Sequence, residues 1–130
     1  MKEEFVTLET ARLLKERGFN EAVFTFYESK CAEGDLELFE SYEAENFNAN
    51  IDYLSAPTQP IAQKWLREAK NLHITIIRNA CGYGYDICKA DNGTHITDGI
   101  FDGPNDGGQW DTYEEALEVG IQEALKLIQS

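Results

Sequence analysis

The segment from Asp98 to Gln109 has oxygen-bearing side chains at spacings that could bind a cation. Asp98, Asp102 and Gly103, with Gln109 at the twelfth position, approach the pattern of a calcium-binding loop. In such loops oxygen ligands recur at alternate positions and a glycine permits a sharp turn. Ile100 occupies the third ligand position and Gln109 replaces the bidentate glutamate, so two ligand groups are lost. A plain acidic loop is the favoured interpretation.

A second set of residues consists of the types that bind zinc: His73, Cys81, Cys88 and His95. They come from neighbouring predicted strands and could therefore converge. None of the tight spacings of structural zinc sites is present, and His73 alternates with apolar residues as an ordinary strand residue would. We therefore predict no metal site and no cofactor.

Paired carboxylates offer a third kind of chemistry. Asp86 and Asp98 could work as a general acid and base, which would make the protein a small hydrolase-like enzyme. That function needs a concave pocket that joins the two groups, and no sequence pattern indicates one. An enzyme is accordingly the least favoured class, and we predict no catalytic residue.

Aromatic residues beside the acidic loop form a candidate contact surface for a partner. We predict that Trp110, Tyr83 and Tyr85 bind a protein together with Asp102 and Asp106. Aromatic side chains combine a large apolar area with a polar atom, which suits them to interfaces. Packing in the core is the alternative for the two tyrosines.

Charge limits the class of partner. The chain has 24 acidic and 11 basic residues, a formal net charge of −13. A field of this sign repels phosphate backbones, so direct nucleic-acid binding is disfavoured and a basic protein partner is favoured. Two functions fit: a non-enzymatic protein-binding or accessory module, and an inhibitor that imitates nucleic acid and occupies a host DNA-acting enzyme.

The sequence also predicts where the protein resides. The longest apolar run has about four residues, too short for a membrane span or for the apolar part of a signal peptide. Three cysteines, an odd number without framework spacing, favour reduced thiols over disulfides. We therefore expect a cytoplasmic protein that does not associate with membranes.

Three helix starts share one pattern, a threonine followed by an alanine and by apolar residues at helical spacing. Thr7, Thr58 and Thr112 are expected to cap these helices through their hydroxyls. We predict helices over residues 8–17 and 59–70 and a third after Thr112, and strands over residues 22–28, 36–41, 72–78, 83–90 and 94–101. Residues 42–55 are predicted to be an ordered loop.

The apolar positions predict which helix faces are buried. The expected inward residues are Leu8, Ala11 and Leu14 in the first helix, Ile61, Trp65, Leu66 and Ala69 in the second, and Leu117, Gly120, Ile121, Ala124, Leu125 and Ile128 in the third.

These elements predict an α+β fold in the order α-β-β-α-β-β-β-α, as a single acidic domain over residues 1–130. Residues 22–28 and 36–41 should pair as a hairpin, and Asp91, Asn92 and Gly93 should form the turn of another. We expect the three helices mainly on one face of one antiparallel sheet. The other face would then be available for a homodimer.

Three segments carry a resemblance to a known group of proteins. They are Phe5 to Phe19, Ser55 to Glu68 and Asp111 to Ile121, which cover the three predicted helices and about half of the chain. Their sequences resemble those of a family of short uncharacterised proteins of gut Bacteroidota and of their phages and mobile elements. The resemblance implies a bacterial or phage setting, and it brings no known activity, ligand or functional residue.

Overall fold

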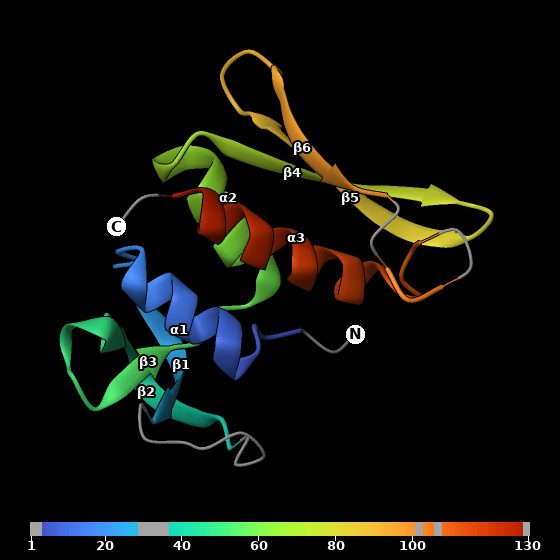
Figure 1. The fold of residues 1–130 in the computed structure, drawn as a ribbon. Coiled ribbons are helices and arrows are strands. Elements are labelled where there is room, and N and C mark those ends of the chain that lie inside the picture. Colours follow the sequence, from blue (N-terminus) through green and yellow to red (C-terminus); the bar gives the residue numbers. More distant parts are fainter. Residues whose placement is uncertain (1–3, 29–36, 101–102, 106–107, 129–130) are drawn as a thin grey trace. The chain divides into compact units, whose positions relative to one another are not determined.

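The described part of the chain contains three α-helices, one short 3-10 helix and six strands (Figure 1). A computed structural model gives this fold and describes residues 4–28, 37–100, 103–105 and 108–128. The elements are α1 (Leu8–Glu16), β1 (Val23–Glu28), β2 (Phe39–Glu45), η1 (Phe47–Ala49), β3 (Tyr53–Ser55), α2 (Gln59–Ala69), β4 (Leu72–Asn79), β5 (Gly82–Lys89), β6 (His95–Gly99) and α3 (Tyr113–Leu127). The predicted α+β class is confirmed.

The strands form two antiparallel sheets, whereas the sequence predicted one. The first sheet has the order β2-β1-β3 and the second the order β4-β5-β6. The chain divides accordingly into two compact units, with the boundary between Thr58 and Gln59. Because α1 belongs to the first unit and α2 and α3 to the second, the three helices do not share one sheet.

In the first unit, α1 begins as predicted and ends one residue earlier, at Glu16. The Thr7 hydroxyl accepts a hydrogen bond from the Thr10 amide at 3.4 Å. Gly18, just beyond the helix, has a φ of +90°, a left-handed conformation that glycine adopts at low cost. The predicted inward residues Leu8, Ala11 and Leu14 are buried.

The first sheet buries one face of β1 and packs aromatic rings on the other. Val23, Thr25 and Tyr27 are buried, as the alternation of a strand with one buried face requires. On the opposite face the Phe26 ring lies 4.4 Å from the ring of Phe47, measured between centroids. The rings of Phe39 and Tyr53 lie 5.5 and 4.8 Å from the Phe26 ring.

Residues 42–55 are more regular than the predicted loop. β2 continues to Glu45, and β3 pairs with β1 as the third strand of the sheet. The Asn48 side chain secures this segment, because its amide donates to the Phe19 carbonyl at 2.9 Å and its oxygen accepts from the Ser55 amide at 2.8 Å. A strand of three residues held by side-chain bonds leaves no periodic signal in the sequence.

In the second unit, α2 has its predicted bounds to within one residue but a different buried face. Trp65 and Leu66 are buried as expected, whereas Ile61 is 43% exposed and Ala69 is also exposed. The polar residue Gln59 takes an inward position instead. Its amide donates to the Glu114 carbonyl and to a Glu118 carboxylate oxygen, both at 2.9 Å, and these bonds offset the cost of its burial.

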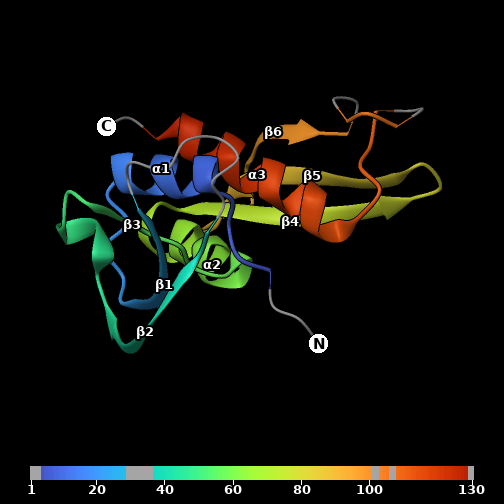
Figure 2. The same cartoon turned by 90° about the horizontal axis from the view of Figure 1, so that it is seen from below.

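The second sheet and α3 follow the sequence closely. β4, β5 and β6 form an antiparallel meander, and Gly93 has a φ of +75° in the predicted turn between β5 and β6. The Thr112 hydroxyl caps α3 by accepting from the Glu115 amide at 3.1 Å. α3 lies along the sheet beside α2 (Figure 2). The predicted inward residues Leu117, Gly120, Ile121, Ala124 and Leu125 are buried, and Ile128 is half-buried.

No helix within the described residues is both long enough and apolar enough to span a membrane.

Candidate functional site

The face of the second sheet that points away from the buried core carries most of the chemistry-bearing side chains. Tyr85 and Ile87 of β5 are buried, and α3 contacts β5. Because successive strand residues point to opposite faces, Asp86 and Cys88 lie on the other face, called here the outer face. Residues directly opposite each other in antiparallel strands share a face, so the partners of Asp86 and Cys88 lie there too.

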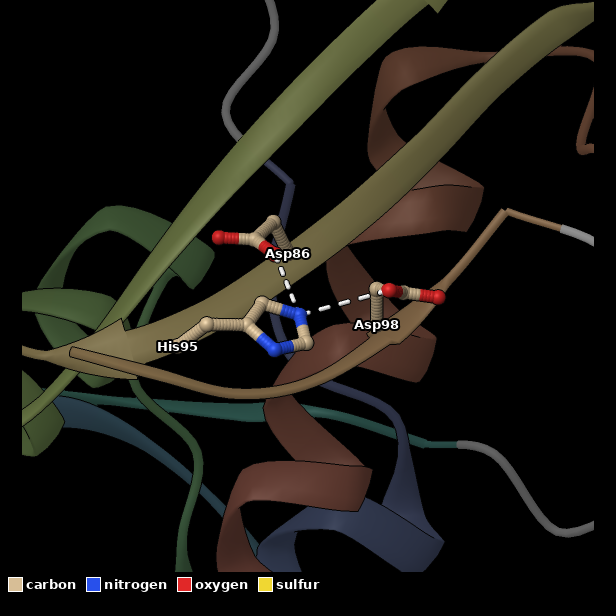
Figure 3. Close-up of side chains that lie close together, drawn as sticks. All are labelled: Asp86, His95 and Asp98. Carbon is tan, nitrogen blue, oxygen red and sulfur yellow. Dashed lines mark ion pairs between the residues drawn. The ribbon is translucent and has the colours of Figure 1, made fainter.

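Asp86, His95 and Asp98 converge on the outer face (Figure 3). Nε2 of His95 lies 3.0 Å from Oδ1 of Asp86 and 3.3 Å from Oδ2 of Asp98. The side chains are 28% exposed for Asp86, 56% for His95 and 40% for Asp98, so solvent reaches all three.

The register of β5 and β6 explains this convergence. Asp86 stands directly opposite Asp98, and Cys88 directly opposite His95. The register shifts between Ile87 and Cys88, so β6 has one residue more than β5 over this stretch. This bulge turns the strand locally and brings the His95 ring back towards the two carboxylates.

The cluster places like charges opposite each other. Two carboxylates facing across a strand pair repel. Within the described part of the chain neither Asp86 nor Asp98 pairs with a lysine or arginine, and His95 is their partner for both ion pairs. Such an arrangement can hold a proton or a cation between its three polar atoms. The predicted acid and base pair, Asp86 and Asp98, is therefore brought together, and sequence reasoning missed that His95 joins it.

The four residues weighed as zinc ligands are brought together only in part. His73, Cys88 and His95 form one row across the outer face, each the direct strand partner of the next. Cys81 lies in the turn before β5, where its amide donates to Asn79. Within the described residues, the ligand atoms of His73, Cys81 and Cys88 do not join a group of three.

Part of the calcium-like loop lies outside the described residues, namely Asp102 and Asp106. The Asp98 carboxylate faces His95, and Gln109 is buried, with its side-chain oxygen unpartnered within the described residues. The predicted roles of Asp102 and Asp106 in partner binding remain predictions.

The aromatic residues predicted to contact a partner lie mostly in the core. Trp110 is 8% and Tyr85 4% exposed, with ring centroids 5.8 Å apart, so both lie in the core and not on an exposed surface, and their predicted role in partner binding stays a prediction. Backbone bonds between Tyr83 and Trp110 hold the segment before α3 against β5. Tyr83 is half-buried, and the Arg78 guanidinium lies 4.8 Å above its ring.

A different exposed aromatic residue lies on β2 of the first unit. The Tyr42 side chain is fully exposed, at 104% of its reference area. Glu40, Glu43 and Glu45 of the same strand are exposed as well. We call these four residues the β2 edge. Sequence reasoning missed it because it ended this strand at residue 41 and assigned Tyr42 to a loop.

The fold and these clusters define a small acidic α+β protein with two antiparallel sheets. Neither protein-family models, nor curated proteins, nor solved structures contain a match to this chain. The resemblance to short proteins of Bacteroidota and their phages therefore stays a prediction.

Proposed function

We propose that this protein is a non-enzymatic protein-binding module that takes a basic partner at the β2 edge. One observation carries the proposal: a fully exposed tyrosine lies among three exposed glutamates on a strand without a basic residue. Tyrosine is enriched among the residues that dominate binding energy, and acidic neighbours select positively charged partners.

The position of β2 in its sheet makes this surface accessible. β2 lies at the edge of the sheet, in the order β2-β1-β3. Glu40 of β2 pairs with Thr25 of β1, and Glu45 pairs with Val23. Between these two pairs β2 advances by five residues and β1 by two, so β2 has extra residues there. Tyr42 lies in this bulged part of β2. Bulges of this kind redirect side chains, and here the result is an aromatic ring in solvent.

Protection against aggregation does not account for the whole arrangement. Charges and bulges on an edge strand also prevent unwanted strand pairing. A large exposed aromatic side chain works against that purpose, since it adds apolar area to the edge. A hollow of about 370 Å³ borders Glu40, Ser41 and Tyr42 among the described residues.

Charge supports a basic partner. Glu40, Glu43 and Glu45 have no ion pair with another side chain within the described residues. The nucleic-acid-mimicking inhibitor is the alternative that uses the same charge. The two differ in that mimicry depends on summed charge, whereas the module depends on Tyr42.

Peptide binding tests the proposal. Fluorescently labelled arginine-rich and lysine-rich peptides, with and without aromatic residues, would be titrated with the full chain and followed by fluorescence anisotropy. We expect Tyr42→Ala to weaken binding at least about tenfold, as loss of an interface anchor does. Glu43→Gln with Glu45→Gln should reduce the salt dependence of binding.

Tyr113→Ala is the matched control, because Tyr113 is an exposed tyrosine of the second unit at 44% exposure. It should bind as the unaltered chain does. Equal binding by Tyr42→Ala and the unaltered chain would refute the β2 edge as the binding surface. The mimicry alternative would replace the module if binding followed net charge alone and if affinity capture from cells, with this chain as bait, returned a DNA-acting enzyme.

A further inference from the structure

We propose that Asp86, His95 and Asp98 form a binding site for a divalent transition-metal ion of the zinc type. The sequence predicted no metal site, and of the four zinc-ligand candidates weighed there only His95 belongs to this cluster. The site lies in the second unit and is independent of the β2 edge.

Two of the three separations between the polar atoms match those between ligands of one ion. With metal–ligand bonds of about 2.0–2.1 Å, two ligands lie about 2.9 Å apart at a 90° angle and about 3.4 Å apart at the tetrahedral angle. The observed separations from Nε2 of His95 are 3.0 and 3.3 Å. All three ligand atoms lie within 4.8 Å of one another. Both carboxylates are part-exposed, so a side-chain rotation can adjust the third separation.

A single hydrogen bond from His95 leaves one of the two carboxylates without a donor from the imidazole. Both carboxylates point at the same atom, Nε2 of His95. That atom carries at most one hydrogen, which can form one strong bond. When Nε2 carries no hydrogen, three acceptors face each other. A cation between them satisfies all three at once and removes the repulsion between the two aspartates.

The ligand set selects the kind of ion. One imidazole nitrogen with two carboxylate oxygens is a set that Zn²⁺ accepts, and three protein ligands leave a position for water. Calcium and magnesium prefer oxygen ligands alone. Strand pairing sets the backbone positions of two of the three ligands, because Asp86 and Asp98 are direct partners in the sheet.

Isothermal titration of the full chain with ZnCl₂ tests the site, and CoCl₂ provides a spectroscopic signal from the bound ion. We expect one ion per chain. His95→Gln, Asp86→Asn and Asp98→Asn should each weaken binding at least about tenfold, because each removes one of three ligands. The two asparagine substitutions keep the side-chain shape, and circular dichroism verifies that each variant is folded.

The chain provides a matched control in its second histidine. His73→Gln alters the only other imidazole, which lies on the same face and outside the cluster. Its affinity should stay within about twofold, and the Co²⁺ spectrum should show no thiolate band. The proposal is overturned by an absence of binding, by equal losses in His73→Gln and His95→Gln, or by binding that requires the cysteines. Calcium binding that needs Asp98 but not His95 would also overturn it and would favour the calcium-like loop.

Discussion

At the scale of single residues, the ring of Tyr85 depends on a glycine directly opposite it. Gly99 of β6 pairs with Tyr85 of β5, and a Cβ atom at Gly99 would overlap the Tyr85 ring and lie 2.7 Å from its hydroxyl oxygen. Tyr85 is 4% exposed, so its ring has little room to move. Gly99 is therefore required for packing, next to the Asp98 ligand proposed above.

Gly99→Ala should lower the free energy of unfolding by about 1–3 kcal/mol, because the added methyl group forces the buried Tyr85 ring from its position. Urea unfolding of the two proteins measures this difference. Ile96→Ala on the same strand is the control, since Ile96 is 37% exposed, and its cost should stay below about 1 kcal/mol. Equal stability of Gly99→Ala and the unaltered chain would show that the ring is free to move.

The candidate sites show how far sequence reasoning reaches at this scale. It selected Asp86 and Asp98 as a pair and placed His95 on a neighbouring strand, because alternation and turn residues predict strands. It did not join His95 to the pair, since the extra residue of β6 opposite Ile87 and Cys88 has no signature in the sequence. It also placed Trp110 on the surface, because neighbouring glycines suggested a loop and gave no sign of the bridge to Tyr83.

At the scale of elements, helix faces were predicted where the apolar stripe is long and missed where it is short. In α3 the buried residues recur over the whole helix, and Leu127 lies off the stripe at 45% exposure. In α2 the inward position of Gln59 depends on its bonds to α3, which a pattern of apolar residues does not contain. The pattern of apolar residues therefore placed Ile61 in the core, whereas Gln59 takes an inward position and Ile61 is exposed.

Two leucines of α3 provide a matched test of this face. Leu125 is 0% exposed and Leu127 is 45% exposed, two residues apart on one helix. Leu125→Ala should cost about 2–5 kcal/mol because it leaves a cavity in the core. Leu127→Ala should cost less than about 1 kcal/mol, because the side chain is exposed and because alanine and leucine both favour helices. Urea unfolding distinguishes them, and similar costs at both positions would contradict the buried stripe.

At the scale of the whole molecule, the sequence predicted the order of the elements but joined the strands into one sheet. The hairpin of β1 and β2 and the meander of β4, β5 and β6 are both local pairings, which turn and alternation signals predict. Whether two such groups share a sheet depends on which edges are covered. Here β3 pairs with β1 and completes a separate first sheet, and its three residues were too few to be predicted.

The prediction of a single domain now has a direct test, because both tryptophans, Trp65 and Trp110, belong to the second unit. Units of about 60 residues are marginally stable alone, so we expect the two to unfold together. Leu14→Ala removes a fully buried side chain from α1 in the first unit. If the chain unfolds as one domain, this substitution lowers the urea midpoint reported by tryptophan fluorescence and by circular dichroism equally. A fluorescence midpoint that stays unchanged, with a separate earlier transition in circular dichroism, would show that the units unfold independently.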